Sequence, residues 1–557
     1  MISQKTSEWK DGRSFCLCEK KRLENFGIID VDKAVIEKDN VYLIMAAITN
    51  ADASDKTRRE RCMIHRNMPG AFRENVQAAS RASVSQYALI CFVILTPVWM
   101  LYALLILNGK GLNPQILIPT YNDEVAWFTQ VESMLTYGAP LGYEGYNATH
   151  APVGTFGPWG IATLVPYAFV GKLIGWEFHS MVIANTLLLS AAIAVFILLT
   201  KPNKKQLLWL GIGYASMSIT VGYSMLAMAE SLRYALAIVM AGMLIKQYRK
   251  EGGKVFTFVL IPLVILFSVQ VYLIFALMIP IYVFLILREK KIVVRLGAGA
   301  AITAVAALIE NHILGLVTSP YTESTRTALM EGILENPYQG VVGMVRVFVH
   351  NLETINPVHY IELAANNHGI LVYFFIGYLG LTALLIKRIK EKHAGDFYEI
   401  VSLYVLLGFL TGYCALYTGE AWTLCRGINT AMVFAVFFLL FEKGQKLLRF
   451  LVLFSLIAGI SSWQYYADRI EQKDVAYAQA AHILEERERI SEIMDLSEAS
   501  DKWENTIAHY GEVTNVYLEL PAGAGTNYME NETINTKARW AAVSKCEQEY
   551  YAKRIER

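Results

Sequence analysis

The chain has 557 residues, of which 54% are hydrophobic, and its mean hydropathy is +0.35. Long apolar runs at this density exclude a single soluble domain and indicate a polytopic membrane protein. The formal net charge is only +1, which gives no electrostatic reason to expect a nucleic-acid partner. The seven cysteines show no metal-ligand spacing and imply no disulfide framework.

The first apolar run, Ala88–Leu107, follows a long polar arm and is long enough to cross a bilayer. Its position predicts an uncleaved anchor and not a cleaved signal peptide. Further apolar runs lie at about 181–200, 207–226, 228–245, 255–269, 271–287, 296–317, 369–386, 398–417, 428–441 and 450–465. They lack the alternation of a membrane barrel, so we expect helices whose backbone amides are satisfied internally. The sequence predicts an all-α membrane protein with about eleven transmembrane helices.

Lysines and arginines concentrate in the short loops between these runs, which marks those loops as cytoplasmic. The arm before the first run is also basic, so the N-terminus is assigned to the cytoplasm. Both assignments hold if Val255–Leu287 crosses twice, with a hinge near Val269–Gln270, and if Trp159–Trp176 lies on the outer surface without crossing. We therefore expect a multi-pass protein of the cell membrane whose C-terminus is outside.

Three domains follow from this topology. Residues 1–85 form a cytoplasmic arm or small domain, residues 86–465 form the transmembrane bundle, and residues 466–557 form a soluble outer region. This last region is acidic and predicts a helix near Asp474–Met494 and a possible strand at Val513–Leu520. It is too small to be the main catalytic body.

The outer segment after the first run carries an acidic doublet. Residues 121–127 read YNDEVAW, residues 149–152 read THAP, and residues 157–159 read GPW. This pattern resembles the first outer loop of the GT-C glycosyltransferases, where an acidic motif precedes a His-Pro-Pro-like turn and a surface helix. The turn here, His-Ala-Pro, is a partial match. The resemblance implies a GT-C-like fold over about residues 88–465, and a transferase acting on the outer face. Its sugar would come from a polyprenyl-phosphate carrier, and its acceptor would be a glycan, a lipid or a protein.

Such a transfer needs a base for the acceptor hydroxyl and a cation for the departing phosphate. By its match to the motif, Asp123 is the predicted base of an inverting displacement, and Glu124 orients the acceptor or binds a metal. A divalent cation held by these two acids is the one cofactor that the sequence leaves open. A solvated pair of loop acids is the simpler alternative.

Five further residues are predicted to bind substrate. Glu230 and Arg233 share a helix face at the outer end of an apolar segment, where an intrahelical ion pair is the alternative. Arg426, near Glu420, is the predicted phosphate ligand, although arginine also anchors helix ends in lipid. His150 either orients a hydroxyl or completes a turn.

Two other classes of membrane protein remain open. An oligosaccharide polymerase or ligase would depend on Arg326, Arg346 and the histidines of the later outer loop. A lipid-linked sugar transporter or flippase would show paired discontinuous helices and charges deep in the bundle. The charged candidates instead gather at one membrane face, as expected for chemistry on one side of the membrane.

Overall fold

The computed structural model describes the chain from Ser85 onward, with gaps. The residues outside the description are 1–84, 121, 141–144, 147–160, 318–334, 354–355, 357, 359–368, 393–394, 417–420, 441–448, 450–451, 453–454, 456–458, 460–462, 498–505, 511–517, 519, 530–539 and 544–557. The predicted cytoplasmic arm therefore lies outside the described residues, apart from Ser85. The same holds for most of the predicted last span, 450–465.

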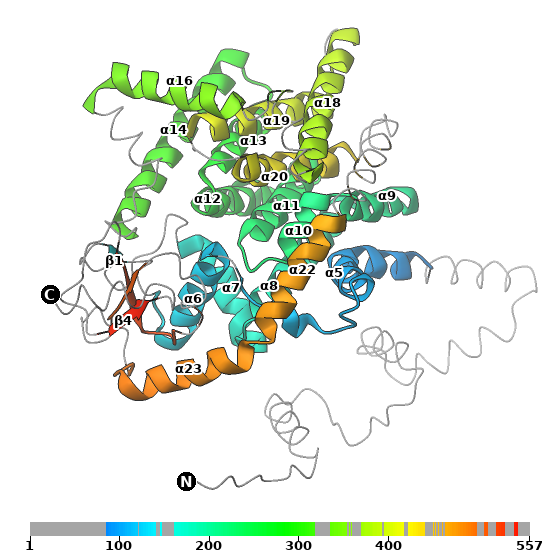
Figure 1. The fold of residues 1–557 in the computed structure, drawn as a ribbon. Coiled ribbons are helices and arrows are strands. Elements are labelled where there is room, and N and C mark those ends of the chain that lie inside the picture. The colour runs from blue at the N-terminus through cyan, green and yellow to red at the C-terminus, as the bar shows by residue number, and fades with distance from the viewer. Residues whose placement is uncertain are drawn as a thin grey trace, which may run out of the picture. The chain divides into compact units, whose positions relative to one another are not determined.

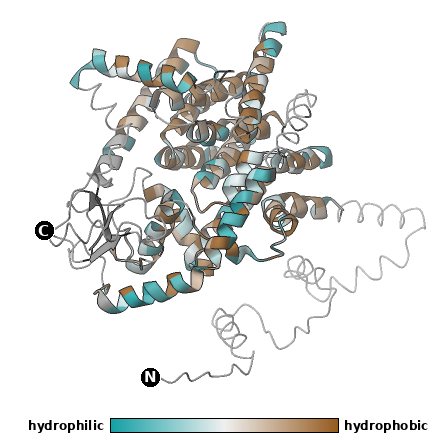
Figure 2. Ribbon diagram, in the orientation of Figure 1, coloured by the Kyte–Doolittle hydropathy of each residue, from teal (hydrophilic) through white to brown (hydrophobic). Residues whose placement is uncertain are grey.

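Apolar helices form the body of the described chain (Figure 1). They are α5 (Thr96–Leu107), α8 (Ser180–Thr200), α9 (Lys204–Ala215), α10 (Ser218–Ser224), α11 (Glu230–Tyr248), α12 (Ile261–Val271), α13 (Met278–Ile286), α14 (Ile292–Val317), α16 (Pro337–Glu353), α18 (Gly369–Glu391), α19 (Phe397–Leu416) and α20 (Ala421–Leu439). Helices α11 and α20 pack on each other, α8 covers α11, and α19 covers α20. Apolar side chains dominate these central helices (Figure 2), so the core lies along α11 and α20.

Five described helices are long and apolar enough to cross a membrane, namely α8, α18, α20, Ile292–Glu310 of α14 and Phe397–Ala415 of α19. The helical segment Ser85–Ile94 and α5 would form a sixth span, bent by 64°. These helices confirm the predicted helical bundle and make the chain an integral membrane protein. The count of eleven spans stays a prediction.

Two predicted helices are interrupted. The predicted run 207–226 divides into α9 and α10, where Ser216 Oγ donates to Gly213 O at 2.9 Å and competes with continuation of the helix. In the predicted double crossing, Tyr272 is extended (φ −159°), between α12 and the 3₁₀ turn Leu273–Leu277. The hinge therefore lies a few residues beyond its predicted position. This break matters for the site, because Tyr272 contacts Arg233.

The first outer segment, as predicted from the sequence, contains α6 (Asn122–Tyr137) and α7 (Ile161–Ile174). With 14 residues, α7 is about 21 Å long, which is shorter than a hydrocarbon core of about 30 Å. Its Tyr167 is fully buried, and the helix packs on α6, α8 and α12. The assignment of this segment to the outer surface stays a prediction.

The C-terminal region contains strands as well as helices. It contains α22 (Trp463–Tyr477), α23 (Ala480–Ile493) and the strands β2 (Thr506–Tyr510), β3 (Gly525–Met529) and β4 (Trp540–Val543). With β1 (Gly145–Tyr146) of the first outer segment they form a parallel sheet, ordered β1-β3-β2-β4. Such short strands depend on partners remote in sequence, so local patterns gave little sign of them.

Contacts along α6 hold the C-terminal region against the first outer segment. The predicted helix at Asp474–Met494 is present as the end of α22 and as α23, and most of the predicted strand lies outside the described residues. Tyr137 Oη of α6 lies 2.7 Å from Leu496 O and 2.9 Å from Ala522 O, so its single hydroxyl hydrogen can bond to either carbonyl. Strand β1 adds backbone pairing to β3. The segment with α6 and β1 and the C-terminal region are therefore joined into one structure.

Candidate functional site

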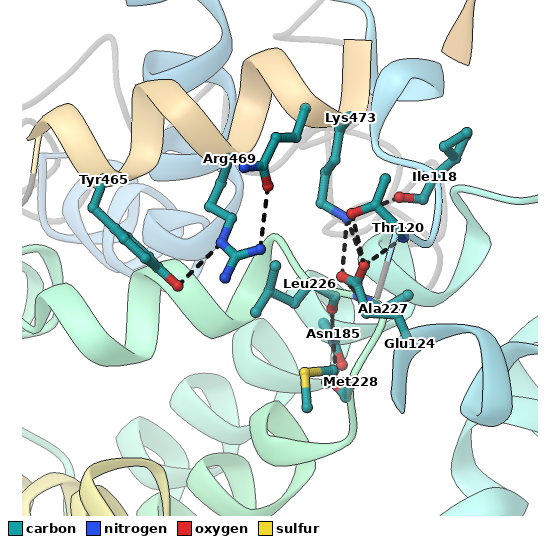
Figure 3. A network of polar contacts seen from close by, with 11 residues as sticks. Ile118, Thr120, Glu124, Asn185, Leu226, Ala227, Met228, Tyr465, Arg469 and Lys473 are labelled. Atoms are coloured by element: carbon teal, nitrogen blue, oxygen red, sulfur yellow. Dashed lines mark hydrogen bonds and ion pairs between the residues drawn. The ribbon is translucent and has the colours of Figure 1, made fainter. Parts of the chain in front are cut away.

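Glu124, the second acid of the doublet, is buried at the start of α6 and has both carboxylate oxygens occupied (Figure 3). Oε2 accepts from Thr120 N at 2.7 Å and Oε1 accepts from Ala227 N at 2.9 Å. Lys473 Nζ of α22 lies 2.9 Å from Oε1 and 3.0 Å from Oε2. Glu124 thus joins α6, the loop before α11, and α22.

Lys473 is as deeply buried as its partner. Its ammonium also donates to Ile118 O at 2.8 Å, so the backbone before α6 shares the same contact. Burial lowers the pKa of Lys473 below its ordinary value, and the neighbouring Glu124 carboxylate opposes this shift. A buried charge pair with full hydrogen bonding loses much when one partner is removed. We therefore regard this pair as a structural connection between α6 and α22.

Asp123, the first acid, faces a different group of charges. Arg426 Nη1 of α20 donates to Asp123 Oδ2 at 3.2 Å and lies 3.8 Å from Glu230 Oε1 of α11. Glu230 Oε1 is also 3.5 Å from Arg233 Nη1, one helical turn along α11. The four residues form an alternating chain of two carboxylates and two guanidinium groups, in which Glu230 is only 4% exposed.

The surrounding backbone fixes these side chains. Asn185 of α8 donates to Leu226 O at 2.7 Å and Met228 O at 3.0 Å, and accepts from Tyr167 at 2.7 Å. These bonds hold the loop that supplies Ala227 N to Glu124 and leads into Glu230. On the other side, the Arg233 guanidinium lies 4.5 Å from the centre of the Tyr272 ring. The break at Tyr272 therefore helps to orient the charged chain.

A cavity of about 170 Å³ opens beside Asp123 and Arg426. Its other lining residues are Glu124, Tyr223, Leu226, Met228, Trp422, Thr423, Tyr465 and Arg469. Trp422 of α20 stacks on Tyr465 of α22, with ring centres 4.8 Å apart. Arg469 Nε donates to Tyr465 Oη at 3.2 Å, which places a second guanidinium at the cavity (Figure 3).

The sequence analysis missed the contribution of α22. Tyr465, Arg469 and Lys473 are spaced by four residues, so they share one helix face just after the last apolar run. That stripe was the available signal. Its partners could not be read from the sequence, since Lys473 and Glu124 are separated by 349 positions.

The structure brings together Asp123, Glu230, Arg233 and Arg426, and it places Glu124 beside them with its oxygens directed to Lys473. His150 and Glu420 lie outside the described residues, as do Arg326, His359 and His368. Of the residues predicted for a polymerase or ligase, Arg346 and His350 are described, and both are exposed on α16. Within the described ranges, no three His, Cys, Asp or Glu side chains are grouped so as to hold a metal ion.

No family model and no curated protein matches the chain. Among solved structures, it is similar to the apo oligosaccharyltransferase of Archaeoglobus fulgidus (TM-score 0.44, 12% identity, 80% of this chain covered). It is also similar to AglB, the oligosaccharyltransferase of the same organism in complex with an inhibitory peptide and a dolichol-phosphate (TM-score 0.41, 12% identity, 79% covered).

The matched regions cover 65% and 64% of those two chains.

Proposed function

We propose that the chain is a membrane glycosyltransferase that moves a sugar from a polyprenyl-phosphate carrier to an acceptor hydroxyl on the outer face. The observation that carries this proposal is the meeting of Asp123, Glu230 and Arg426 beside one cavity at the ends of apolar helices. A potential base and a potential phosphate ligand are then close enough to act on one substrate.

Arg426 is the proposed ligand of the carrier phosphate. Its Nη1 contacts the two carboxylates, its side chain lines the cavity, and a planar guanidinium can bind two phosphate oxygens at once. Arg469 adds a second positive charge at the cavity. The N-terminal ends of α6 and α20 contribute Asp123 and Trp422 to the cavity lining, and their helix dipoles favour an anion.

In the proposed reaction the acceptor oxygen attacks the anomeric carbon from the side opposite the phosphate. The new bond to the acceptor forms as the bond to the phosphate oxygen breaks, and the phosphate leaves with that electron pair. The acceptor proton passes to the Asp123 carboxylate. A polyprenyl phosphate is already a stable anion, so it needs no strong general acid, and the configuration of the sugar is inverted.

We assign Glu124 a different role from the one expected from its position in the doublet. Its oxygens are already engaged by Lys473, Thr120 and Ala227, so we propose that it positions Asp123 without touching the substrate. Glu230 has one buried oxygen, Oε2, that lacks a hydrogen-bond partner among the described residues. Glu230 therefore remains a proposed substrate ligand, together with Arg233, His150 and Glu420.

The test compares Asp123→Asn with Asp468→Asn in sealed vesicles that contain the purified protein and a set of polyprenyl-phosphate sugars. Asp468 is an exposed α22 residue that contacts Gln464, so it controls for the loss of an acidic charge. We expect transfer to fall at least about 100-fold in Asp123→Asn and to be unchanged in the control. Normal transfer by Asp123→Asn would reject the proposal.

Two further outcomes would select the other classes of membrane protein. Transfer that is lost in Arg346→Ala and retained in Asp123→Asn would favour a polymerase or ligase that works from the later outer loop. Movement of the carrier-linked sugar across the bilayer without any new glycosidic bond would favour a flippase.

A further inference from the structure

A second, larger cavity lies on the other side of α6. Its volume is about 660 Å³, and it is formed by α6, the link between α7 and α8, and the junction of α22 with α23. It shares no lining residue with the cavity beside Asp123. Ile118 lines it, and Ile118 O accepts from Lys473 Nζ, which also donates to Glu124 at the first cavity.

Aromatic rings form one wall of this cavity. Phe128 and Trp176 are stacked with ring centres 5.4 Å apart, and Phe178 lies 5.5 Å from Phe128. Two glycines, Gly171 and Gly175, shape the local backbone beside the Trp176 indole. Gly175 has a positive φ of 89°, and a Cβ on Gly171 would come within 2.7 Å of the Trp176 ring. The ring is thus held in a fixed orientation, as expected for a stacking platform.

Polar atoms without partners lie beside these rings. Trp176 Nε1 and Glu132 Oε2 are buried, and neither has a hydrogen-bond partner among the described residues. The other oxygen, Glu132 Oε1, accepts from Arg487 Nη2, and Arg487 Nη1 donates to Leu518 O at 2.9 Å. Burial raises the pKa of Glu132, and the Arg487 charge opposes that shift. Unsatisfied buried groups of this kind are costly, so a donor and an acceptor are available for a bound molecule.

We propose that this cavity binds a carbohydrate, as a subsite for the glycan part of the acceptor. A sugar hydroxyl both donates and accepts, so it can satisfy Glu132 Oε2 and Trp176 Nε1, while the apolar face of the ring packs on the aromatic wall. The volume lies within the usual range for small-ligand sites. The choice of a carbohydrate over a peptide rests on the proposed glycosyl transfer.

The position of the cavity fits this role. Glu132 follows Asp123 by nine residues on the same helix, which corresponds to a rise of about 13 Å. That separation is too large for one sugar to touch both residues, but several linked sugars can span it. The subsite would therefore select acceptors that carry more than one sugar and hold them beside α6.

Direct binding tests the subsite without any need for catalysis. The full chain is placed in phosphatidylcholine nanodiscs, because maltoside detergents carry a sugar headgroup. Saturation-transfer NMR is then recorded with maltose, N,N′-diacetylchitobiose and mannobiose, and with an uncharged hexapeptide. We expect at least one disaccharide to bind below about 10 mM. The affinity should fall at least about tenfold in Glu132→Gln and in Trp176→Phe, which keeps the ring and removes only the indole N–H.

Two controls separate this inference from the proposed function. Glu488→Gln changes an exposed acid of α23 and should bind the disaccharide like the parent chain. Asp123→Asn should also retain binding, whether or not it abolishes transfer. The inference is overturned if none of the three disaccharides binds, if only the peptide binds, or if both cavity variants bind the sugar as tightly as the parent chain.

Discussion

Replacing Lys473 by methionine should loosen α22 from α6. Lys473 and Glu124 are both almost completely buried, with side chains 2% and 1% exposed. Methionine fills a similar volume but leaves the Glu124 carboxylate without a countercharge, although Thr120 and Ala227 still donate to it. Breaking a buried pair in this way costs about 3–5 kcal/mol. Since about 1.4 kcal/mol corresponds to a factor of ten, local opening should become at least about 100-fold more frequent.

Hydrogen–deuterium exchange of the amides of α22 measures this opening. The double variant Glu124→Gln with Lys473→Met removes both charges. Its α22 amides should be protected from exchange at least about tenfold more than those of Lys473→Met. Lys110→Met provides the matched control, because Lys110 also pairs with α22, through Glu471 and Asp474 at the surface. Its effect should be only a few-fold. If Lys473→Met and Lys110→Met change protection equally, the assignment of the buried pair as the main connection is wrong.

Three other predictions concern the site and its support. Arg426→Lys keeps a positive charge but loses the planar pair of donors, so the KM for the carrier-linked sugar should rise about tenfold or more in vesicle assays. Asn185→Leu leaves two backbone carbonyls without donors and should destabilise the chain by about 2–4 kcal/mol, seen as a lower Tm in nanodiscs; an unchanged Tm would contradict this. Burial lowers the pKa of His179 in the folded chain below its ordinary value of about 6.5. The unfolded chain therefore binds a proton first as pH falls, and folding stability should decrease from about pH 6.5 down to the lowered pKa. In His179→Gln this decrease of the Tm with falling pH should disappear. If the Tm of the variant falls with pH as much as that of the parent chain, His179 is not its cause.

Part of the site could be predicted because its residues carry strong local signals. The doublet at Asp123 matched a motif, and Glu230 and Arg233 stand out as charges within an apolar run. Arg426 stands out in the same way. The pattern could not predict that the two acids have different partners. Neighbouring residues on a helix point in different directions, and their partners are remote in the chain. Asp123 faces Arg426, whereas Glu124 faces Lys473.

The helical bundle was determined by the sequence alone, because every backbone amide in hydrocarbon must be satisfied within its own segment and apolar length then marks each helix. Tertiary structure decided everything that depends on partners remote in the chain. It brought α22 against α6, paired β1 with β3, and placed the aromatic wall of Trp176 beside Glu132. Such contacts leave no periodic trace in the sequence, because their energy comes from complementary groups that meet only in the folded chain.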